Sequence, residues 1–177
     1  LVSGSVGIDA ASTFHLPAGV AITRTNGDMD GDGVNNAPPT FIGPTNLLYN
    51  SAAFDVNQVA GNEIPANTAG GVIGINLTGG GTPTLTFPAS VTSGDMVILG
   101  SNTANVTFNG TVTGNSITVN DANSHSFGNA AVTGGDFVTD SGATIVTGDL
   151  ATNGFRLLQT GGTGSFTSTG TVTNNAL

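Results

Sequence analysis

A regular spacing organises the chain from Gly74 to Leu177. Steps of 20 give a glycine column that ends in one asparagine: Gly74, Gly94, Gly114, Gly134, Gly154 and Asn174. The same step, started three residues later, gives an apolar column: Leu77, Val97, Ile117, Phe137, Leu157 and Leu177. A unit of this length cannot bury its own apolar face, whereas stacked units bury a continuous stripe. The spacing therefore predicts a repeat fold.

Between the glycines lie short runs of β-branched and aromatic residues, bounded by Gly, Asn, Asp and Ser: Thr82–Phe87, Asn105–Phe108, Ser116–Val119 and Ala143–Thr147. This is the composition of short strands between tight turns. We predict an all-β fold, a β-solenoid of about 20-residue coils that each rise about 4.8 Å. The apolar column would fill the interior and the glycine column would turn the corners. A β-sandwich or jelly roll is the alternative, since it also has short strands.

The column directly after the glycines is chemically mixed: Ile75, Asp95, Asn115, Gly135 and Phe155. We expect Phe155 to lie off the core column. The prediction is that Phe137→Ala costs more stability than Phe155→Ala.

Charge excludes several classes of partner. Only 7% of the 177 residues are charged, against about 25% in ordinary soluble domains. The cations are Arg24 and Arg156 alone, against 11 acids, which gives a net charge of −9. Such a chain cannot neutralise a row of phosphates, so nucleic acid and anionic membrane surfaces are excluded. No run of 18 apolar residues exists, so we expect no direct membrane insertion.

The composition points to an extracellular protein. Thr, Ser, Asn and Gly take the place of Lys and Glu, as is usual in secreted or cell-surface β proteins. Cysteine is absent, which excludes a disulfide framework and thiolate metal sites. The chain starts at Leu1 without Met, so we expect a removed signal peptide or an excised piece.

Residues 1–70 do not follow the spacing, so we divide the chain into an N-terminal part, 1–70, and a repeat domain, 71–177. Val2, Val6 and Ile8 alternate with small polar residues and predict a strand over 1–10. That strand either joins its own sheet or is lent to a neighbouring subunit. A second short strand is predicted over 20–23. The prolines of 37–70 predict an irregular cap, in which only 47–56 could form a turn of helix.

One stretch carries recognisable site chemistry, residues 28–36. Carboxylates at alternate positions of a loop converge on one point when a glycine permits a sharp turn, here Gly33. The predicted ligands are all hard oxygen donors, which favours Ca²⁺: Asp28, Asp30, Asp32, the Val34 carbonyl and Asn36. The stretch resembles the DxDxDG calcium loops of EF-hand, dockerin and thrombospondin type 3 repeats. Pro39 stands where an EF-hand has its bidentate Glu, so a further ligand must come from elsewhere, with Asp9 and Asp55 as candidates. The alternative is an acidic turn without metal.

Catalytic signatures are missing from the sequence. His15 and His125 have no motif around them, and Glu63 is the only glutamate. His125 lies in a turn-like Asn-Ser-His-Ser stretch, where we expect an exposed side chain. We therefore predict that the protein is not an enzyme.

Two runs, 105–114 and 161–166, are similar to the β-strand-rich passenger repeats of bacterial autotransporters and to rickettsial-type surface-layer proteins. The resemblance covers residues 70–177 and is one of composition. It implies a bacterial extracellular protein with a structural or adhesive role.

These observations predict a secreted, calcium-stabilised structural protein that assembles with itself into a filament or surface layer. The end residues expected to take part are Leu1, Val2, Val6, Ile8 and Leu177, because no charge or proline protects 160–177 and the N-terminal strand is uncapped. A monomeric adhesin for surface glycans or ice is the alternative. Its Thr-x-Thr pairs, such as Thr84/Thr86 and Thr111/Thr113, do not align in one column of the regular spacing.

Overall fold

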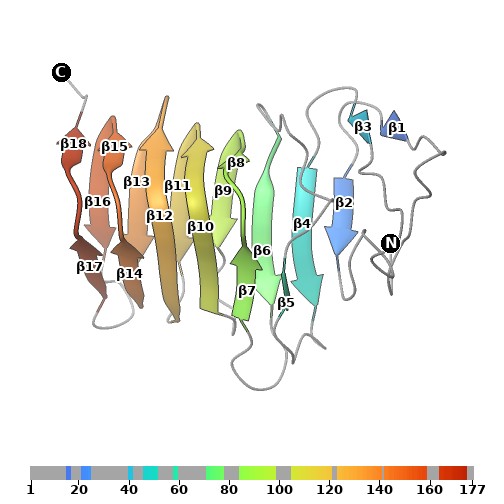
Figure 1. Ribbon diagram of the computed structural model, residues 1–177, viewed down its shortest axis with the longest axis horizontal. Coiled ribbons are helices and arrows are strands. Elements are labelled where there is room, and N and C mark those ends of the chain that lie inside the picture. The colour runs from blue at the N-terminus through green and yellow to red at the C-terminus, as the bar shows by residue number, and fades with distance from the viewer. Residues whose placement is uncertain are drawn as a thin grey trace.

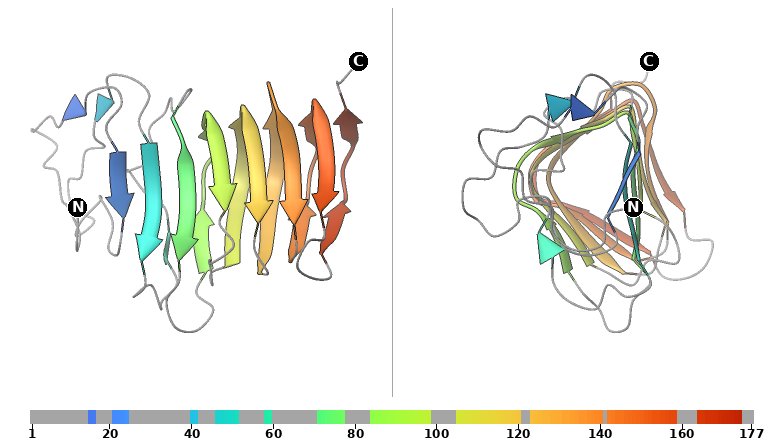
Figure 2. Two further views of the ribbon diagram at one scale, coloured as in Figure 1. Left: turned by 180° about the vertical axis from the view of Figure 1, so that it is seen from behind. Right: turned by 90° about the vertical axis from the view of Figure 1, so that its right-hand side faces the viewer.

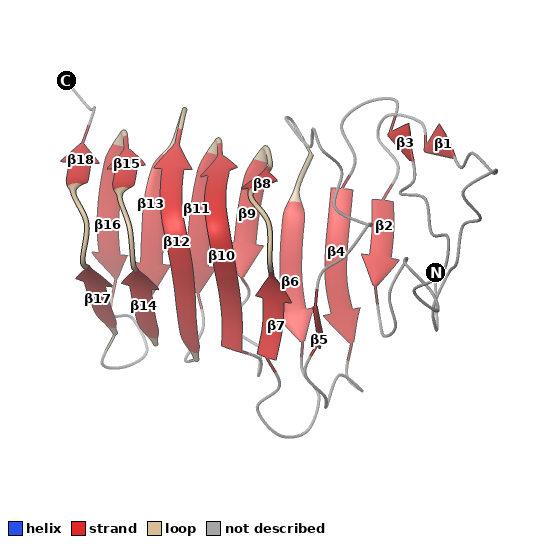
Figure 3. Ribbon diagram, in the orientation of Figure 1, coloured by secondary structure: helices blue, strands red, loops and turns tan. Residues whose placement is uncertain are grey.

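The computed structural model describes residues 15–16, 21–24, 40–41, 46–51, 58–59, 71–77, 84–98, 105–120, 123–140, 142–158 and 164–174. Every regular element in these ranges is a β-strand (Figure 3). No helix long and apolar enough to cross a membrane occurs among them. The predicted all-β class is confirmed.

Two parallel sheets carry the fold (Figure 1). The seven-stranded sheet contains, in spatial order, β16 (Gly154–Leu158), β13 (Asp136–Asp140), β11 (Ser116–Asn120), β9 (Asp95–Ile98), β6 (Ile73–Leu77), β4 (Asn46–Ser51) and β2 (Ala21–Arg24). The nine-stranded sheet contains β17 (Ser165–Ser168), β14 (Ala143–Val146), β12 (Ser124–Val132), β10 (Asn105–Gly114), β7 (Thr84–Phe87) and β5 (Gln58–Val59), with β8 (Val91–Thr92), β15 (Leu150–Thr152) and β18 (Val172–Asn174) beside them. A separate pair joins β1 (His15–Leu16) to β3 (Thr40–Phe41).

The chain alternates between the two sheets, so each strand pairs with its counterpart one coil later. The predicted β-solenoid is confirmed: the stacked coils lie about 21 residues apart and make about four turns. Seen end-on in Figure 2, the coil is three-sided, because the nine-stranded sheet bends in its middle. Each strand recurs above its predecessor because one face of every coil is apolar and only stacking removes it from water.

The strictly constant register predicted from the sequence was wrong. One interior column of the seven-stranded sheet reads Leu47, Ile73, Met96, Ile117, Phe137 and Phe155. From Leu47 onward, each step along the chain is shorter than the one before it. Phe155 therefore continues the column of Phe137, and Val97 turns away from the core. A shift by a single position moves a residue to the other face, because side chains alternate along a strand.

The interior is apolar over most of its length. A second column of the same sheet, Tyr49, Ile75, Ile98 and Val119, is at most 1% exposed. Opposite it, the rings of Phe87, Phe108 and Phe127 stack with centroids 4.5 and 4.9 Å apart and planes within 21°. These stacked rings and aliphatic columns supply the burial that holds the coils together.

Glycines lie at two corners. Gly94, Gly114, Gly134 and Gly154 stand within a residue or two of the turn into the seven-stranded sheet, as predicted, whereas Gly74 lies inside β6. Gly110, Gly128, Gly148 and Gly170 form a second set at the bend of the nine-stranded sheet. A Cβ on Gly128 would lie 2.6 Å from the Asn109 carbonyl oxygen. Successive coils approach too closely there for any side chain.

Two predictions in the N-terminal part can be compared with described strands. β2 at 21–24 agrees with the second strand expected at 20–23. The stretch 47–56, in which a turn of helix was possible, begins instead with a strand: Asn46–Ser51 forms β4 and pairs with both β2 and β6, while 52–56 lie outside the described residues. Leu47 and Tyr49 are fully buried, so tertiary packing decided the conformation of this short apolar run.

Candidate functional site

In the last coil that the structure describes, part of the apolar interior reaches solvent. Leu157 and Val172 continue buried columns, yet they are 42% and 49% exposed, whereas Val119 and Leu150 are 1% and 0% exposed. Beside them Phe155 and Phe166 are partly buried, with ring centroids 4.6 Å apart. Among the described strands, β16, β17 and β18 each pair on one side only. We call this surface, made by Phe155, Leu157, Phe166 and Val172, the open end; it lies at the red end of Figure 1.

A directional ladder of hydrogen bonds runs toward the open end. The Asn129 Oδ1 atom accepts the Asp149 N–H at 2.8 Å, and Asp149 Oδ1 accepts the Thr171 N–H at 2.8 Å. Two coils before Asn129, the Ser90 hydroxyl oxygen accepts the Thr111 N–H at 3.1 Å. In each case a side-chain oxygen bonds to the backbone of the following coil. These bonds fix how one coil sits on the next.

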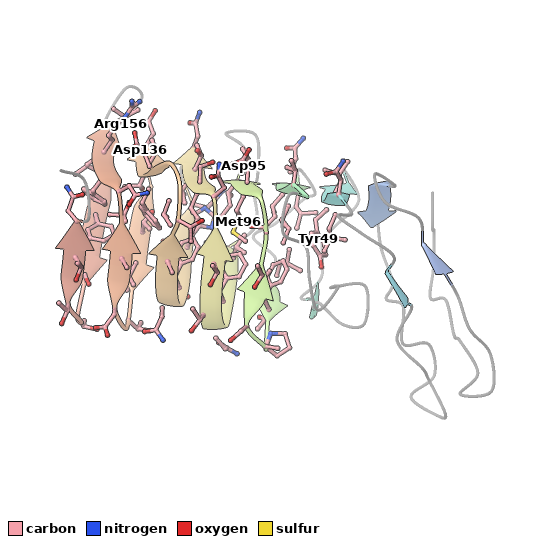
Figure 4. The ribbon with its side chains drawn as sticks, turned by 90° about the horizontal axis from the view of Figure 1, so that it is seen from above. Tyr49, Asp95, Met96, Asp136 and Arg156 are labelled. Carbon is pink, nitrogen blue, oxygen red and sulfur yellow. The ribbon has the colours of Figure 1, made fainter. Side chains whose placement is uncertain are left out.

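A groove lined by polar residues and one glycine lies at the corner where the nine-stranded sheet turns into the seven-stranded one. It has a volume of about 480 Å³, and its lining residues come from three successive coils: Thr92, Ser93, Gly94, Asp95, Thr113, Asn115 and Thr133. We call it the corner groove. Figure 4 shows Asp95 at this edge of the molecule, with the Met96 side chain directed inward.

Asp95 is held in place by the next coil. Its Oδ1 accepts the Ser116 hydroxyl at 2.7 Å and the Asn115 amide nitrogen at 3.1 Å. These two hydrogen bonds, the one from Ser116 first, lower the pKa of the Asp95 carboxyl below its ordinary value of 3.8. At neutral pH the groove therefore carries an ionised, positioned carboxylate.

Single threonines of successive coils stack in the true register, although the Thr-x-Thr pairs Thr84/Thr86 and Thr111/Thr113 do not form one column. Thr86 pairs with Thr107, and Thr92 with Thr113, on the outer face of the nine-stranded sheet. Both pairs are separated by the coil length of about 21 residues, so a search at steps of 20 cannot detect them. The Thr92 and Thr113 pair forms one wall of the corner groove.

The expectation of an exposed His125 was wrong. Its side chain is 1% exposed, and its Nδ1 accepts the Val106 N–H at 3.2 Å. The flanking polar residues suggested a turn, but Ser124–Val132 is a strand that directs His125 inward. Thr139 and Thr144 are also buried there, with hydroxyl oxygens 2.7 Å apart. We assign these groups to internal hydrogen bonding.

Most residues predicted for a site lie outside the described part of the chain. This applies to the whole 28–36 loop, with Asp28, Asp30, Asp32, Val34 and Asn36, and to the assembly residues Leu1, Val2, Val6, Ile8 and Leu177. Within the described ranges no three His, Cys, Asp or Glu side chains form a group that could hold a metal. The structure instead brings together Asp95 and Asn115, which the sequence already placed in one column. That shared column was the only available signal for the corner groove.

Comparisons with known proteins give no family. No protein-family model, curated protein or solved structure matched this chain. Function must therefore be argued from the open end, the corner groove and the composition.

Proposed function

We propose that this protein is an extracellular structural β-solenoid that assembles with itself, end to end, into a filament or surface layer. The observation that carries the proposal is the open end, where core columns that are buried in earlier coils reach solvent. Removal of exposed apolar area of this kind from water is favourable by about 25 cal/mol per Å², and association must offset its entropy cost from that gain. A further coil placed there would bury these side chains as each coil buries the one before.

The backbone of the last coil supports the same contact. The outer edges of β16, β17 and β18 pair with no described strand, so their N–H and C=O groups can bond to another chain. Natural edges are commonly protected by charge or proline. Residues 154–174 contain no proline and only one charged side chain, Arg156, which lies 3.8 Å from Asp136.

Charge and strand direction favour a head-to-tail arrangement. Residues 1–70 carry six acids and one arginine, while Arg156 is the only charged residue from 154 to 177. A tail-to-tail contact would bring two Arg156 side chains together, whereas a head-to-tail contact places Arg156 near an acidic region. The described strand pairs are all parallel, and β2 at the far end pairs on one side only among the described strands. A translated copy would meet β16 with strands in the same direction, a heterologous contact that propagates.

Secretion and calcium belong to the proposal on sequence grounds. Low charge and a surface of Thr, Ser, Asn and Gly support an extracellular location in a bacterial surface protein. The Asp28, Asp30 and Asp32 carboxylates, so close in sequence, would repel one another without a cation. We propose that Ca²⁺ bound there stabilises the N-terminal part.

Sedimentation velocity at increasing concentration, with calcium present, tests the assembly. The native chain should form species that grow with concentration, visible as filaments or layers by electron microscopy. Leu157→Lys should reduce the association, because it places a charge in the open end without disturbing a buried position. Ile145→Lys is the matched control: Ile145 is 39% exposed but lies on the outer face of the nine-stranded sheet.

Two outcomes would contradict the proposal. One is a native chain that stays monomeric at about 100 μM, far above a micromolar dissociation constant; the monomeric binding module would then be favoured. The other is equal loss of association in Leu157→Lys and Ile145→Lys, which would show that the open end has no special role.

A further inference from the structure

We propose that the corner groove binds hydroxyl groups of a neutral saccharide chain. This site is separate from the open end, and the inference does not depend on self-assembly. A volume of about 480 Å³ lies within the range of ligand sites, about 300–1,000 Å³. Because the lining residues come from three stacked coils, the groove is formed only by the folded solenoid.

The groove presents fixed hydrogen-bonding groups. Asp95 is positioned by the hydroxyl of Ser116 and the amide of Asn115. A carboxylate offers about four acceptor positions, so Asp95 retains capacity for ligand hydroxyls. Bonds from a neutral donor to an ionised acceptor are about twice as strong as neutral ones. The threonines of the wall add hydroxyls that can both donate and accept, as sugar hydroxyls do.

Other ligand classes fit less well. An anion would meet the ionised Asp95 in a protein with a net charge of −9. Among the described residues, no second carboxylate lines the groove to complete a cation site. An apolar ligand would cover the Asp95 carboxylate and the threonine hydroxyls without replacing their hydrogen bonds to water. Neutral polyols remain as the class that matches the wall.

Titration of the full chain, labelled with ¹⁵N, by cellohexaose, maltohexaose and chitohexaose tests the site by NMR. We expect at least one sugar to shift the amide signals of Asp95, Thr113 and Asn115 with a dissociation constant on the order of 1 mM, as a few solvent-exposed hydrogen bonds allow. Signals of the open end should not move. No shift in the groove with any of the three sugars up to several times that concentration would overturn the proposal.

Variants assign the binding to the groove. Asp95→Asn should weaken it about tenfold, the loss expected for one charge-assisted hydrogen bond. Thr113→Val leaves the carboxylate in place and should weaken it a few-fold. Asp136→Asn is the matched control, because Asp136 begins the strand two coils further on and does not line the groove. Equal affinity in Asp95→Asn and Asp136→Asn would overturn the assignment to the groove. Larger amide shifts with spermidine, a polyamine cation, than with any sugar would overturn the assignment to a neutral saccharide.

Discussion

Replacement of Phe108 by alanine probes the stacked interior. Phe108 is 1% exposed, and its ring stacks between Phe87 and Phe127 at centroid distances of 4.5 and 4.9 Å. Loss of a buried phenylalanine costs about 3–5 kcal/mol, because apolar burial is lost and a cavity remains. Two stacked contacts, each worth about 0.5–1.5 kcal/mol beyond burial, place Phe108 at the upper end, about 5 kcal/mol.

Phe166→Ala is the matched control. Phe166 has the same side chain but lies in the last coil and is only partly buried. Its removal leaves space that opens toward solvent instead of a closed cavity, so we expect a loss of about 2 kcal/mol. Phe108→Leu keeps most of the volume and should cost less than Phe108→Ala.

Urea unfolding followed by circular dichroism measures both losses. With a slope of about 2 kcal/mol per M, the midpoint should fall by about 2.5 M for Phe108→Ala and by about 1 M for Phe166→Ala. Stacked repeats can unfold in parts, so the comparison requires a single transition with an unchanged slope. Equal midpoint shifts in the two variants would refute the reasoning that a closed stack of rings holds the coils together.

Three further predictions concern the corners and the acidic groups. Gly128→Ala should lower the urea midpoint by the equivalent of about 1–3 kcal/mol, because the new Cβ meets backbone oxygens. Gly74→Ala should cost clearly less, because its new Cβ meets only the end of the Leu48 side chain, at 3.1 Å. A larger loss for Gly74→Ala would contradict the close approach of the coils at Gly128. Folding lowers the pKa of Asp95, so its ionised carboxylate stabilises the folded state above pH 3.8, and this stabilisation is lost as the pH falls through the lowered pKa. The stability of Asp95→Asn should therefore depend less steeply on pH below about pH 4 than that of the native chain. Superimposable acid-unfolding curves would contradict this. Removal of Ca²⁺ by EDTA should lower Tm, since calcium at 100 times its Kd adds about 2.7 kcal/mol, and Asp30→Ala should abolish the effect; a melting curve unchanged by EDTA would exclude the site.

Phe137 and Phe155 occupy one interior column, which the sequence predicted for Phe137 alone. Phe137 is fully buried, as its place in the apolar column indicated. Phe155 was expected to lie off that column, yet it pairs directly with Phe137, their ring centroids 6.1 Å apart. The expected smaller cost of Phe155→Ala now rests on its place in the open last coil.

The amino-acid sequence by itself determined the class of fold. The β-branched runs at 84–87, 105–108, 116–119 and 143–146 all became strands, because their alternation and bounding turn residues are local properties. The recurrence of glycine and apolar residues also determined that coils stack, since one coil cannot bury its own face. Most glycines of the predicted column lie at a corner of the coil, and Gly74 is the exception.

Only the tertiary structure decided the register. Corners can gain or lose a residue at little cost, so the coils shorten between Ile73 and Phe155 while the interior columns stay in line. A fixed spacing cannot follow that drift, which is why it missed the pairing of Thr92 with Thr113 and of Phe137 with Phe155. The burial of His125 was also decided by the tertiary structure, whereas Asp95 and Asn115, 20 residues apart, already shared a column of the fixed spacing. Which side chains meet depends on the path of the neighbouring coil, and no local pattern encodes that path.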